Sequence, residues 1–345
     1  MTGHTGFKGS WLSLWLQKWG ANLTGFALPP PTTPSLFELA GVGKGMHSIT
    51  GDIRDYERLR SALADHRPEV IIHMAAQSIV RASYEDPRET YSTNVMGTVN
   101  LFEGVRQLNL PCVIVNVTSD KCYENREWLW GYRETDLMGG HDPYSNSKGC
   151  AELVTSSFRA SFFRSFDRGN ARVALASARA GNVVGGGDWT RDQLVPDIVR
   201  AFLAEKPVAI RNPHAVRPWQ FVLEPLDGYL TLAEKLAEQG SDFAEAWNFG
   251  PQEDDAVPVS FIVETIAKMW GGGARWEVEP GEHPHEAGYL KLDISKARNV
   301  LGWRPKLRLG EALRWVVDWY KAFQRREDMR EQTHADIARY ESLFD

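Results

Sequence analysis

Tyr144 and Lys148 are the pair of residues whose types and spacing most directly suggest chemistry. Side chains four residues apart lie on one face of a helix, so the lysine ammonium can approach the tyrosine hydroxyl. A phenol has a pKa of about 10 in water, and a neighbouring cation favours the phenolate. Such a tyrosine can take the proton of an alcohol while hydride leaves the same carbon. Taken alone, the pair leaves open a second interpretation, a tyrosine on a buried face beside a solvated lysine.

The apolar run 112–117 is followed directly by Thr118, Ser119, Asp120 and Lys121. Open α/β sheets bind ligands at the carboxyl ends of their strands, so these four side chains are expected to face a ligand crevice. Asp120 and Lys121 would supply an acid and a base close together. A salt-bridged surface turn is the alternative.

A glycine-containing loop near the start of the sequence is suited to a cofactor phosphate. Its relevant residues are Gly3, Thr5, Gly6, Phe7 and Gly9. Because glycine has no Cβ, the chain can turn tightly and bring its amides close to a diphosphate. The helix expected next would direct its N–H groups and its dipole at the same phosphates. The glycine spacing departs from the G-x-G-x-x-G pattern, so an ordinary turn remains the alternative.

Further candidate residues fall where other strands are expected to end. They are Asp52, Ile53, Ala75, Ala76, Gln77, Asn182, Gly187, Asp188 and Trp189. A random scatter of such residues would not gather at one edge of a sheet, so we expect them to line a single site. The second strand ends in Phe26-Ala27-Leu28, without the acid expected for NAD or an arginine for NADP. The residues alone therefore leave the identity of the cofactor open.

Alternating strands and helices are predicted for the first half of the chain. The strands cover residues 21–28, 47–52, 69–76, 112–119 and 171–180, and the helices cover 8–19, 55–66, 87–109 and 144–166. Several strands are apolar throughout, as expected when helices cover both faces of a parallel sheet. The pattern predicts an α/β fold with a doubly wound, Rossmann-like parallel sheet in a dinucleotide-binding domain of residues 1–185.

After residue 185 the predicted elements become shorter and less regular. Helices are predicted at 193–204, 225–238, 259–270 and 309–323, with an isolated strand at 208–211. We interpret residues 186–345 as mainly a smaller, mixed α/β lobe that binds substrate, with the chain free to cross between the two parts. The glycine loop lacks the strand that normally precedes it in the middle of such a sheet. We therefore expect an upstream extension of about six to ten residues to stabilise the fold.

The composition is that of an ordinary globular protein. The formal net charge of -6 argues against a nucleic-acid partner. No apolar run approaches the length of a bilayer span, and no basic segment followed by an apolar one begins the chain, so neither a membrane segment nor a signal peptide is expected. Three cysteines without a CxxC spacing, and histidines 283 and 285 without further ligands, indicate a reduced, cytoplasmic protein with no metal site.

Motifs along nearly the whole chain resemble the extended short-chain dehydrogenase/reductase family. They are TGHTGFKG at 2–9, HMAAQ at 73–77, Asn94, YSNSK at 144–148, RPWQ at 217–220, and LDISKA and LGW near the C-terminus. The segment 118–153 is similar to the nucleotide-sugar 4,6-dehydratases of this family, in particular those that act on CDP-D-glucose. The resemblance implies an enzyme with tightly bound NAD that is recycled within each turnover, and a homodimer or homotetramer.

The resemblance also implies roles for individual residues. Tyr144, helped by Lys148 and Thr118, would remove the proton of the C4 hydroxyl as hydride passes from C4 to NAD. Lys121 would then remove the C5 proton, or only stabilise the enolate. Asp120 would protonate the departing C6 hydroxyl.

Binding residues follow from the resemblance in the same way. Cofactor contacts are implied for Gly3, Thr5, Gly6, Phe7, Gly9, Asp52, Ile53, Ala75, Ala76, Gln77, Asn94, Thr118, Tyr144 and Lys148. Substrate contacts are implied for Gln77, Ser119, Asn182, Gly187, Asp188, Trp189, Arg217 and His285. The alternatives are a dehydratase for another nucleotide-sugar, a 4-epimerase on the same scaffold, and a non-catalytic NAD-binding regulatory module.

Overall fold

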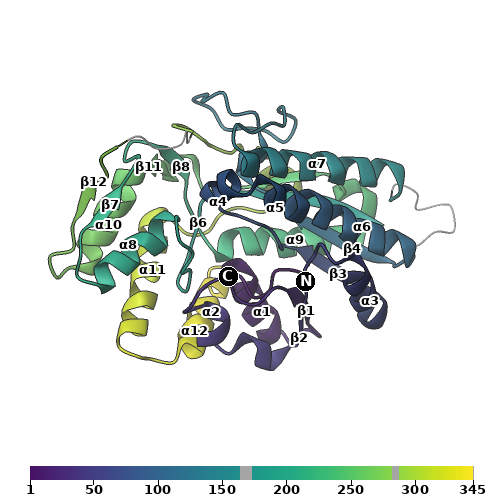
Figure 1. Cartoon of the computed structure of the whole chain (residues 1–345), viewed down its shortest axis with the longest axis horizontal. Helices are drawn as coiled ribbons and strands as arrows, with labels where there is room; N and C mark the ends of the chain where they lie inside the picture. Colours follow the sequence, from purple (N-terminus) through teal and green to yellow (C-terminus); the bar gives the residue numbers. More distant parts are fainter. Residues whose placement is uncertain (164–172, 282–286, 345) are drawn as a thin grey trace.

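A parallel β-sheet forms the centre of the larger part of the fold, on the right in Figure 1. The structure is a computed structural model that describes residues 1–163, 173–281 and 287–344. Every pairing within this sheet is parallel. In spatial order the sheet contains β2 (His47–Thr50), β1 (Thr24–Ala27), the single residue Thr2, β3 (Val70–His73), β4 (Cys112–Val117), β5 (Val173–Ala180) and β10 (Ala246–Phe249).

Thr2 occupies the central position of the sheet, where a strand before the glycine loop is expected. It pairs with Phe26 of β1 and with His73 of β3, and its N–H donates to the carbonyl oxygen of Ile72 at 3.1 Å. The N–H of Phe26 donates to the carbonyl oxygen of Met1 at 2.9 Å. A very short stretch of ladder therefore links β1 to β3. Stabilisation by an upstream extension stays a prediction.

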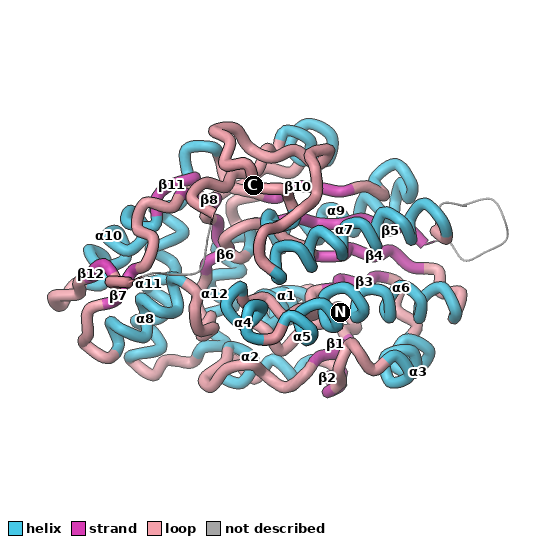
Figure 2. The backbone as a smooth tube through the Cα atoms, turned by 45° about the horizontal axis from the view of Figure 1, so that its top comes forward, coloured by secondary structure: helices cyan, strands magenta, loops and turns pink. Residues whose placement is uncertain are grey.

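Helices cover both faces of the sheet because its strands are apolar on both sides. Ile71 and Ile114 pack with the helices of one face, whereas the adjacent residues Ile72 and Val115 pack with those of the other. Figure 2 shows β3, β4 and β5 beside one another with helices around them. The doubly wound parallel sheet is therefore confirmed. The covering helices are α3 (Tyr56–His66), α6 (Gly97–Gln107) and α7 (Pro143–Ser161) on one face, and α1 (Phe7–Lys18) and α9 (Leu223–Gln239) on the other.

The predicted helix 87–109 is divided into three segments. α5 (Pro87–Tyr91) and α6 are joined by a π-helical turn, η2 (Ser92–Met96). Such turns contain an extra residue and often occur at functional sites. This one turns Asn94 inward, so that only 3% of its surface is exposed.

The start of α7 is fixed by its own sequence. The carboxylate of Asp142 accepts a hydrogen bond from the N–H of Ser145 at 2.9 Å, and Pro143 takes the first helical position, where an N–H would have no partner. These two residues hold Tyr144 in the first turn of the helix and Lys148 one turn later.

The smaller part of the structure, on the left in Figure 1, is built from short strands and three longer helices. α9 and β10 return to the central sheet, so the chain crosses between the two parts; the division at residue 185 stays a prediction. The strand pairs are β7 (Val208–Ile210) with β12 (Trp276–Val278), β8 (Val216–Pro218) with β11 (Ala256–Pro258), and β6 (Val183–Val184) with β9 (Gln220–Phe221). The helices α8 (Leu194–Leu203), α10 (Val259–Trp270) and α11 (Leu309–Gln324) agree closely with the predicted ranges.

The sequence does not predict several of the short elements. β10 is a four-residue segment whose place is set by pairing with the distant β5, which no local pattern reveals. α12 is mostly polar in sequence, but its buried Met329, Ile337 and Tyr340 pack in the core, with the Tyr340 ring 5.7 Å from that of Trp15. None of the helices in the described ranges is long and apolar enough to cross a membrane. The remaining elements are α2 (Leu36–Leu39), α4 (Val80–Glu85), α12 (Met329–Glu341), η1 (Val42–Gly45), η3 (Asp120–Cys122), η4 (Gly240–Phe243), η5 (Glu253–Asp255) and η6 (Ala297–Leu301).

Candidate active site

The glycine loop makes a tight turn between the sheet and α1. Gly3 has a φ of +75°, and a Cβ on it would lie 2.8 Å from the backbone nitrogen of Ala75. A Cβ on Gly9 would lie 2.1 Å from the carbonyl oxygen of Gly3. The N-cap of α1 is Gly6, which has no side chain to occupy the first amides of the helix. The loop therefore brings backbone N–H groups together as an anion site requires.

The other two loop residues are fixed by neighbours on either side. The hydroxyl of Thr5 donates to the carbonyl oxygen of Leu28 at 2.8 Å, just after β1. Phe7 lies against Gly185, where an added Cβ would come within 2.8 Å of its ring. The loop is thus joined both to the central sheet and to the segment that follows β5.

Asp52 and Ile53 follow β2, the strand that pairs with β1. Asp52 forms an ion pair with Arg54 at 2.5 Å, and this hydrogen-bonded contact lowers the pKa of its carboxyl. Ile53 is buried against Gly97 of α6, where a Cβ would lie 2.6 Å from its Cγ2. Both residues thus lie at the end of β2, as their place in the sequence predicts.

The end of β3 is joined to α7 through Asn94. The side-chain oxygen of Asn94 accepts from the N–H of Gln77 at 2.8 Å, and its amide donates to the carbonyl oxygen of Gln77 at 2.9 Å. The same amide donates to the hydroxyl of Ser147 at 2.9 Å. The N–H of Ala75 donates to the hydroxyl of Thr2 at 3.1 Å. Ala75, Ala76 and Gln77 therefore lie between the glycine loop and the helix of Tyr144.

Ser119, and not Thr118, has its hydroxyl beside Tyr144. The hydroxyl of Thr118 donates to Glu152 at 2.5 Å, whereas that of Ser119 is close enough to the phenol of Tyr144 to lower its pKa. Successive side chains of a strand point to opposite sides, so only one of two adjacent hydroxyls can face the crevice. The expectation that Thr118 assists Tyr144 differs from this geometry, which brings Ser119 to that position.

Asp120 is a buried acid, and only one of its two carboxyl oxygens is hydrogen-bonded in the described part of the chain. Its Oδ1 accepts from the hydroxyl of Ser119 at 3.1 Å, and its Oδ2 has no hydrogen-bond partner among the described residues. Burial raises the pKa of the carboxyl, although Lys121 and the Ser119 hydroxyl oppose the rise. Gly181 gives it room, since a Cβ there would lie 2.3 Å from Oδ2. Lys121 is half-buried beside it in the same short helix, η3.

Tyr144 and Lys148 are both buried, at 8% and 6% exposure. Burial raises the pKa of the Tyr144 phenol, and the nearby Ser119 hydroxyl opposes that rise. Burial, together with the charge of Lys8, lowers the pKa of Lys148 to about 7. The Lys148 ammonium donates to the carbonyl oxygen of Val117 at 3.5 Å, which holds it against the end of β4.

Lys8 and Tyr229 also reach this site, although neither is among the residues predicted from the sequence. The Lys8 ammonium lies 5.9 Å from the centre of the fully buried Tyr229 ring. Burial lowers the pKa of Lys8 to about 8, and the charge of Asp120 opposes the fall. A lysine within an apolar helix start is the signal that could reveal the first residue. Tyr229 has no comparable signal, because α9 is apolar along much of its length.

The segment after β5 gives some of its predicted residues to a cavity and others to the core. Asn182 and Asp188 line a cavity of about 50 Å³ together with Trp219. Gly187 has a φ of +79°, and a Cβ there would lie 2.9 Å from Leu36. Trp189 instead packs on Tyr320 and Phe323 of α11, with ring centres 5.3 and 4.9 Å apart. Its ring therefore belongs to the apolar core, which differs from the substrate contact expected for it.

Arg217 in β8 approaches the site from the smaller part. Its guanidinium donates to the carbonyl oxygens of Val216, at 2.8 Å, and Ala287. Its charge also lowers the pKa of Asp120, against the larger effect of burial. His285 lies outside the described residues. Within the described part of the chain, no group of three His, Cys, Asp or Glu side chains could hold a metal ion.

Comparisons with known proteins identify the family of the chain. The family model described as GDP-mannose 4,6 dehydratase matches residues 1–316. The CDP-glucose 4,6-dehydratase of Salmonella typhimurium is 56% identical over 342 residues, which cover 99% of this chain and 95% of that enzyme.

Solved structures of two UDP-glucose 4-epimerases have the same fold. The enzyme of Thermotoga maritima, with UDP-glucose, is 21% identical with a TM-score of 0.80, covering 94% of this chain and 98% of its own. The enzyme of Thermus thermophilus, in complex with NAD, is 24% identical with a TM-score of 0.79, covering 93% and 97%. At these identities the likeness establishes the fold alone.

Proposed function

The chain belongs to the GDP-mannose 4,6-dehydratase family, and from this premise we propose that it dehydrates CDP-D-glucose to CDP-4-dehydro-6-deoxy-D-glucose with NAD as cofactor. The observation that carries the proposal is a buried acid, Asp120, at the same end of the sheet as Tyr144 and Lys148. A 4-epimerase eliminates no water and has no use for this acid. The CDP nucleotide is supported by the 56% identity with the Salmonella typhimurium enzyme.

The residues around the glycine loop fit a dinucleotide. Backbone atoms lie so close to Gly3 and Gly9 that neither position has space for a Cβ, which suits close approach of a diphosphate to the loop amides. The NAD bound by the Thermus thermophilus epimerase, on the same fold, supports the choice of cofactor. When bound, NAD supplies a hydride acceptor for C4 that later returns the hydride to C6. Further contacts are proposed for Thr5, Phe7, Asp52, Ile53, Ala75, Ala76, Gln77 and Asn94.

Tyr144 takes the proton of the C4 hydroxyl in the proposed first step. Its buried phenol keeps its own proton unless a cation lies close, because burial raises its pKa. Lys148 is that cation, and with a pKa of about 7 it is protonated in part of the molecules at neutral pH. The Ser119 hydroxyl completes the set, because it lies close enough to the phenol to lower its pKa.

Asp120 and Lys121 act in the proposed elimination of water. A ketone at C4 acidifies the C5 hydrogen, which Lys121 removes, or Lys121 stabilises the resulting enolate. Asp120 gives its proton to the departing C6 hydroxyl. Its raised pKa keeps the carboxyl protonated to higher pH than an exposed aspartate, as a general acid requires.

The test is to incubate the protein with CDP-, dTDP-, GDP- and UDP-glucose and follow the alkali-labile absorbance of a 4-keto-6-deoxy product. CDP-glucose should give the highest kcat/KM. With substrate deuterated at C4, the label should appear at C6 of the product, without net accumulation of reduced cofactor. A C4 epimer as the main product, or loss of the label to solvent, would contradict the proposal.

We further propose a cytoplasmic homo-oligomer that pairs through α6 and α7. These neighbouring helices, with the turn before α6, leave Met96, Leu153 and Phe162 at least half exposed. Apolar side chains of this size on adjacent helices favour burial against another surface. Sedimentation equilibrium should give a dimer or tetramer, and Leu153→Glu should shift it toward the monomer; a monomeric unsubstituted protein would contradict this.

A further inference from the structure

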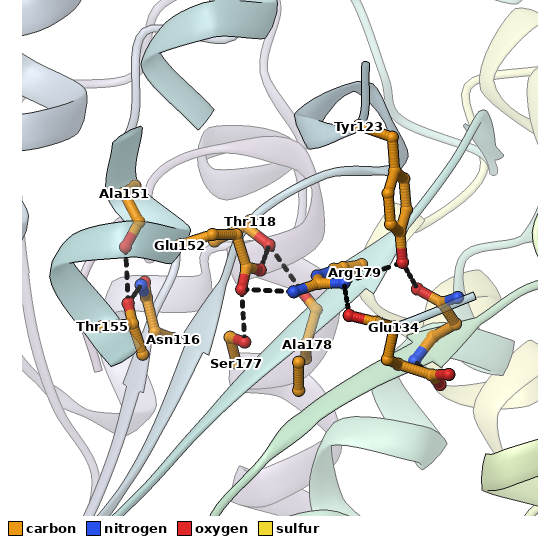
Figure 3. Close-up of polar contacts among 12 residues, drawn as sticks. Asn116, Thr118, Tyr123, Glu134, Ala151, Glu152, Thr155, Ser177, Ala178 and Arg179 are labelled. Atoms are coloured by element: carbon orange, nitrogen blue, oxygen red, sulfur yellow. Dashed lines mark hydrogen bonds and ion pairs between the residues drawn. The ribbon is translucent and has the colours of Figure 1, made fainter. Parts of the chain in front are cut away.

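A buried ion pair lies directly beneath the candidate active site. Glu152 and Arg179 are 2.8 Å apart, and each side chain is only 4% exposed (Figure 3). Glu152 lies on α7, one turn after Lys148 and two turns after Tyr144, so it belongs to the same helix face. Arg179 lies near the end of β5, two residues before the Gly181 that makes room for Asp120.

The ion pair holds the catalytic segment at both of its ends. Glu152 accepts from the hydroxyl of Thr118 at 2.5 Å, immediately before Ser119, Asp120 and Lys121. Arg179 donates to the hydroxyl of Tyr123 at 2.8 Å, directly after η3, and its guanidinium lies 5.0 Å from the centre of that ring.

Further bonds connect the ion pair to the surrounding strands. Ser177 donates to Glu152 at 2.7 Å, and the Tyr123 hydroxyl donates to Asn248 of β10 at 2.6 Å. Arg179 also donates to the carbonyl oxygen of Glu134 at 3.1 Å. Helix α7, the residue after β4 and strand β5 therefore meet at one ion pair, as the dashed contacts in Figure 3 show, and Tyr123 connects the pair to β10.

We propose that Glu152 and Arg179 are positioning residues that fix Asp120 and Lys121 relative to Tyr144 and Lys148. This inference rests on the proposed dehydration, which needs both pairs to act on adjacent carbons of one sugar. Desolvation makes a buried ion pair a weak source of stability, and apolar side chains of similar volume often serve as well or better. The pair is hydrogen-bonded to Thr118 and Tyr123 on either side of the catalytic segment, and Glu152 lies on the helix of Tyr144. Apolar side chains could not hold these groups in place by directional bonds.

Glu152 raises the pKa of Lys148, and the Arg179 cation 2.8 Å away partly neutralises that carboxylate. The other ionisable groups near Lys148 are Lys8 of α1, Cys122 of η3 and His73 of β3. Glu152→Gln would remove an anion that raises the pKa of Lys148, so Lys148 should lose its proton, and activity its alkaline limit, at lower pH. The pH optimum should then move to lower pH. Arg179→Met would leave the Glu152 anion unbalanced and should move the optimum to higher pH.

The experiment measures kcat, KM and the pH profile of CDP-glucose turnover for Glu152→Gln, Arg179→Met and the double variant. Each single variant should lose about 10²-fold in kcat, with KM nearly unchanged, because misplacing reacting groups by about 1 Å has effects of this size. The pH optimum of each single variant should shift by roughly one unit, downward for Glu152→Gln and upward for Arg179→Met. The double variant should regain the original optimum but not kcat. Glu238→Gln, which breaks the surface pair with Lys235 on α9, is the matched control and should change neither quantity.

Thr118→Val keeps both charges and tests the same inference if the charge variants fail to fold. It should lower kcat at constant KM and constant pH optimum, and Thr118→Ser should restore kcat. Full kcat in a folded Thr118→Val protein, or displacement of both single-variant optima in the same direction, would overturn the positioning role. Failure of the unsubstituted protein to convert any nucleotide-glucose would instead reject the proposed function.

Discussion

Two groups of buried polar side chains meet at the end of β4, and they differ in how many of their atoms have partners. On one side, the Glu152 carboxylate accepts from Thr118, Ser177 and Arg179, although Nε of Arg179 has no partner in the described part of the chain. On the other side, Oδ2 of Asp120 and the hydroxyl of Tyr229 are buried without a hydrogen-bond partner in the described part of the chain. The adjacent residues Thr118 and Ser119, which directly follow β4, thus lead into two different environments.

The difference separates side chains that support the fold from side chains that are available to a substrate. A buried polar atom without a partner is costly, so native proteins rarely contain one without a reason. The partnered group around Glu152 supports the fold at this point, and the lowered pKa of Glu152 agrees with a permanently charged carboxylate. The unpartnered group retains hydrogen-bonding capacity that a substrate can use. Substitutions on the two sides should therefore have unequal effects.

The largest effect is expected from Tyr144→Phe on the unpartnered side. Loss of the phenol removes the proposed base of the first step, and turnover should fall by about 10⁴-fold. No transient near-ultraviolet absorbance of reduced cofactor should appear after mixing with substrate. Tyr123→Phe is the matched control, since it removes a buried phenol from the partnered side, and it should lose less than about tenfold. Equal losses in the two variants would contradict the division.

Asp120→Asn should reduce product formation by about 10³-fold while leaving the first oxidation intact. Reduced cofactor should therefore accumulate on the protein, which distinguishes this variant from Tyr144→Phe. The same change should raise the melting temperature at pH 7 by roughly 2–4 °C. Burial raises the folded-state pKa of this carboxyl, so its ionisation opposes folding above its ordinary pKa. The gain should disappear as the pH falls below that ordinary value, and a lower melting temperature at pH 7 would contradict the argument.

The two adjacent hydroxyls provide a finer comparison. Ser119→Ala removes the hydroxyl that lowers the pKa of the Tyr144 phenol and should lower kcat by about 10²-fold. Thr118→Ser retains the hydroxyl that donates to Glu152 and should remain within about threefold of the unsubstituted protein. Steady-state kinetics of both variants decide whether the structure or the family resemblance identifies the assisting hydroxyl. A near-normal kcat in Ser119→Ala would contradict the assignment to Ser119 and favour Thr118.

Much of the fold can be predicted from local pattern, whereas the side of the strand on which a residue lies cannot. β4 and β5 are long apolar runs between helical stretches, and the sequence predicts both within a few residues. The short β10 depends on pairing with a strand far away in the chain, which local pattern does not record. Thr118 and Ser119 are chemically alike, and the contact with Glu152 that separates them appears only once α7 packs on the sheet.

Two features of the sequence could have predicted the pair of Glu152 and Arg179. Glu152 continues the spacing of Tyr144 and Lys148 by one more helical turn, and Arg179 is a charged residue in an otherwise apolar strand. Together these features indicate a buried ion pair. Trp189 shows the opposite case, because its place beside glycines suggests a ligand contact, whereas its ring packs in the core. Burial by a distant helix is a tertiary fact that residue type does not reveal.

The smallest effect is expected from Gly181→Ala, which tests how closely the unpartnered side is fitted. The added Cβ would lie 2.3 Å from Oδ2 of Asp120 and 2.8 Å from Cγ of Pro218, so the carboxyl must move. A displaced acid should lower kcat by about tenfold, a part of the loss expected when the acid is removed altogether. Because Gly181 has no unusual positive φ, the backbone itself tolerates alanine. Gly310→Ala in α11 is the matched control, since no atom lies within 4 Å of its added Cβ, and it should leave kcat unchanged. If kcat is also unchanged in Gly181→Ala, Asp120 can move without loss, and its present position would not be the one that protonates the leaving group.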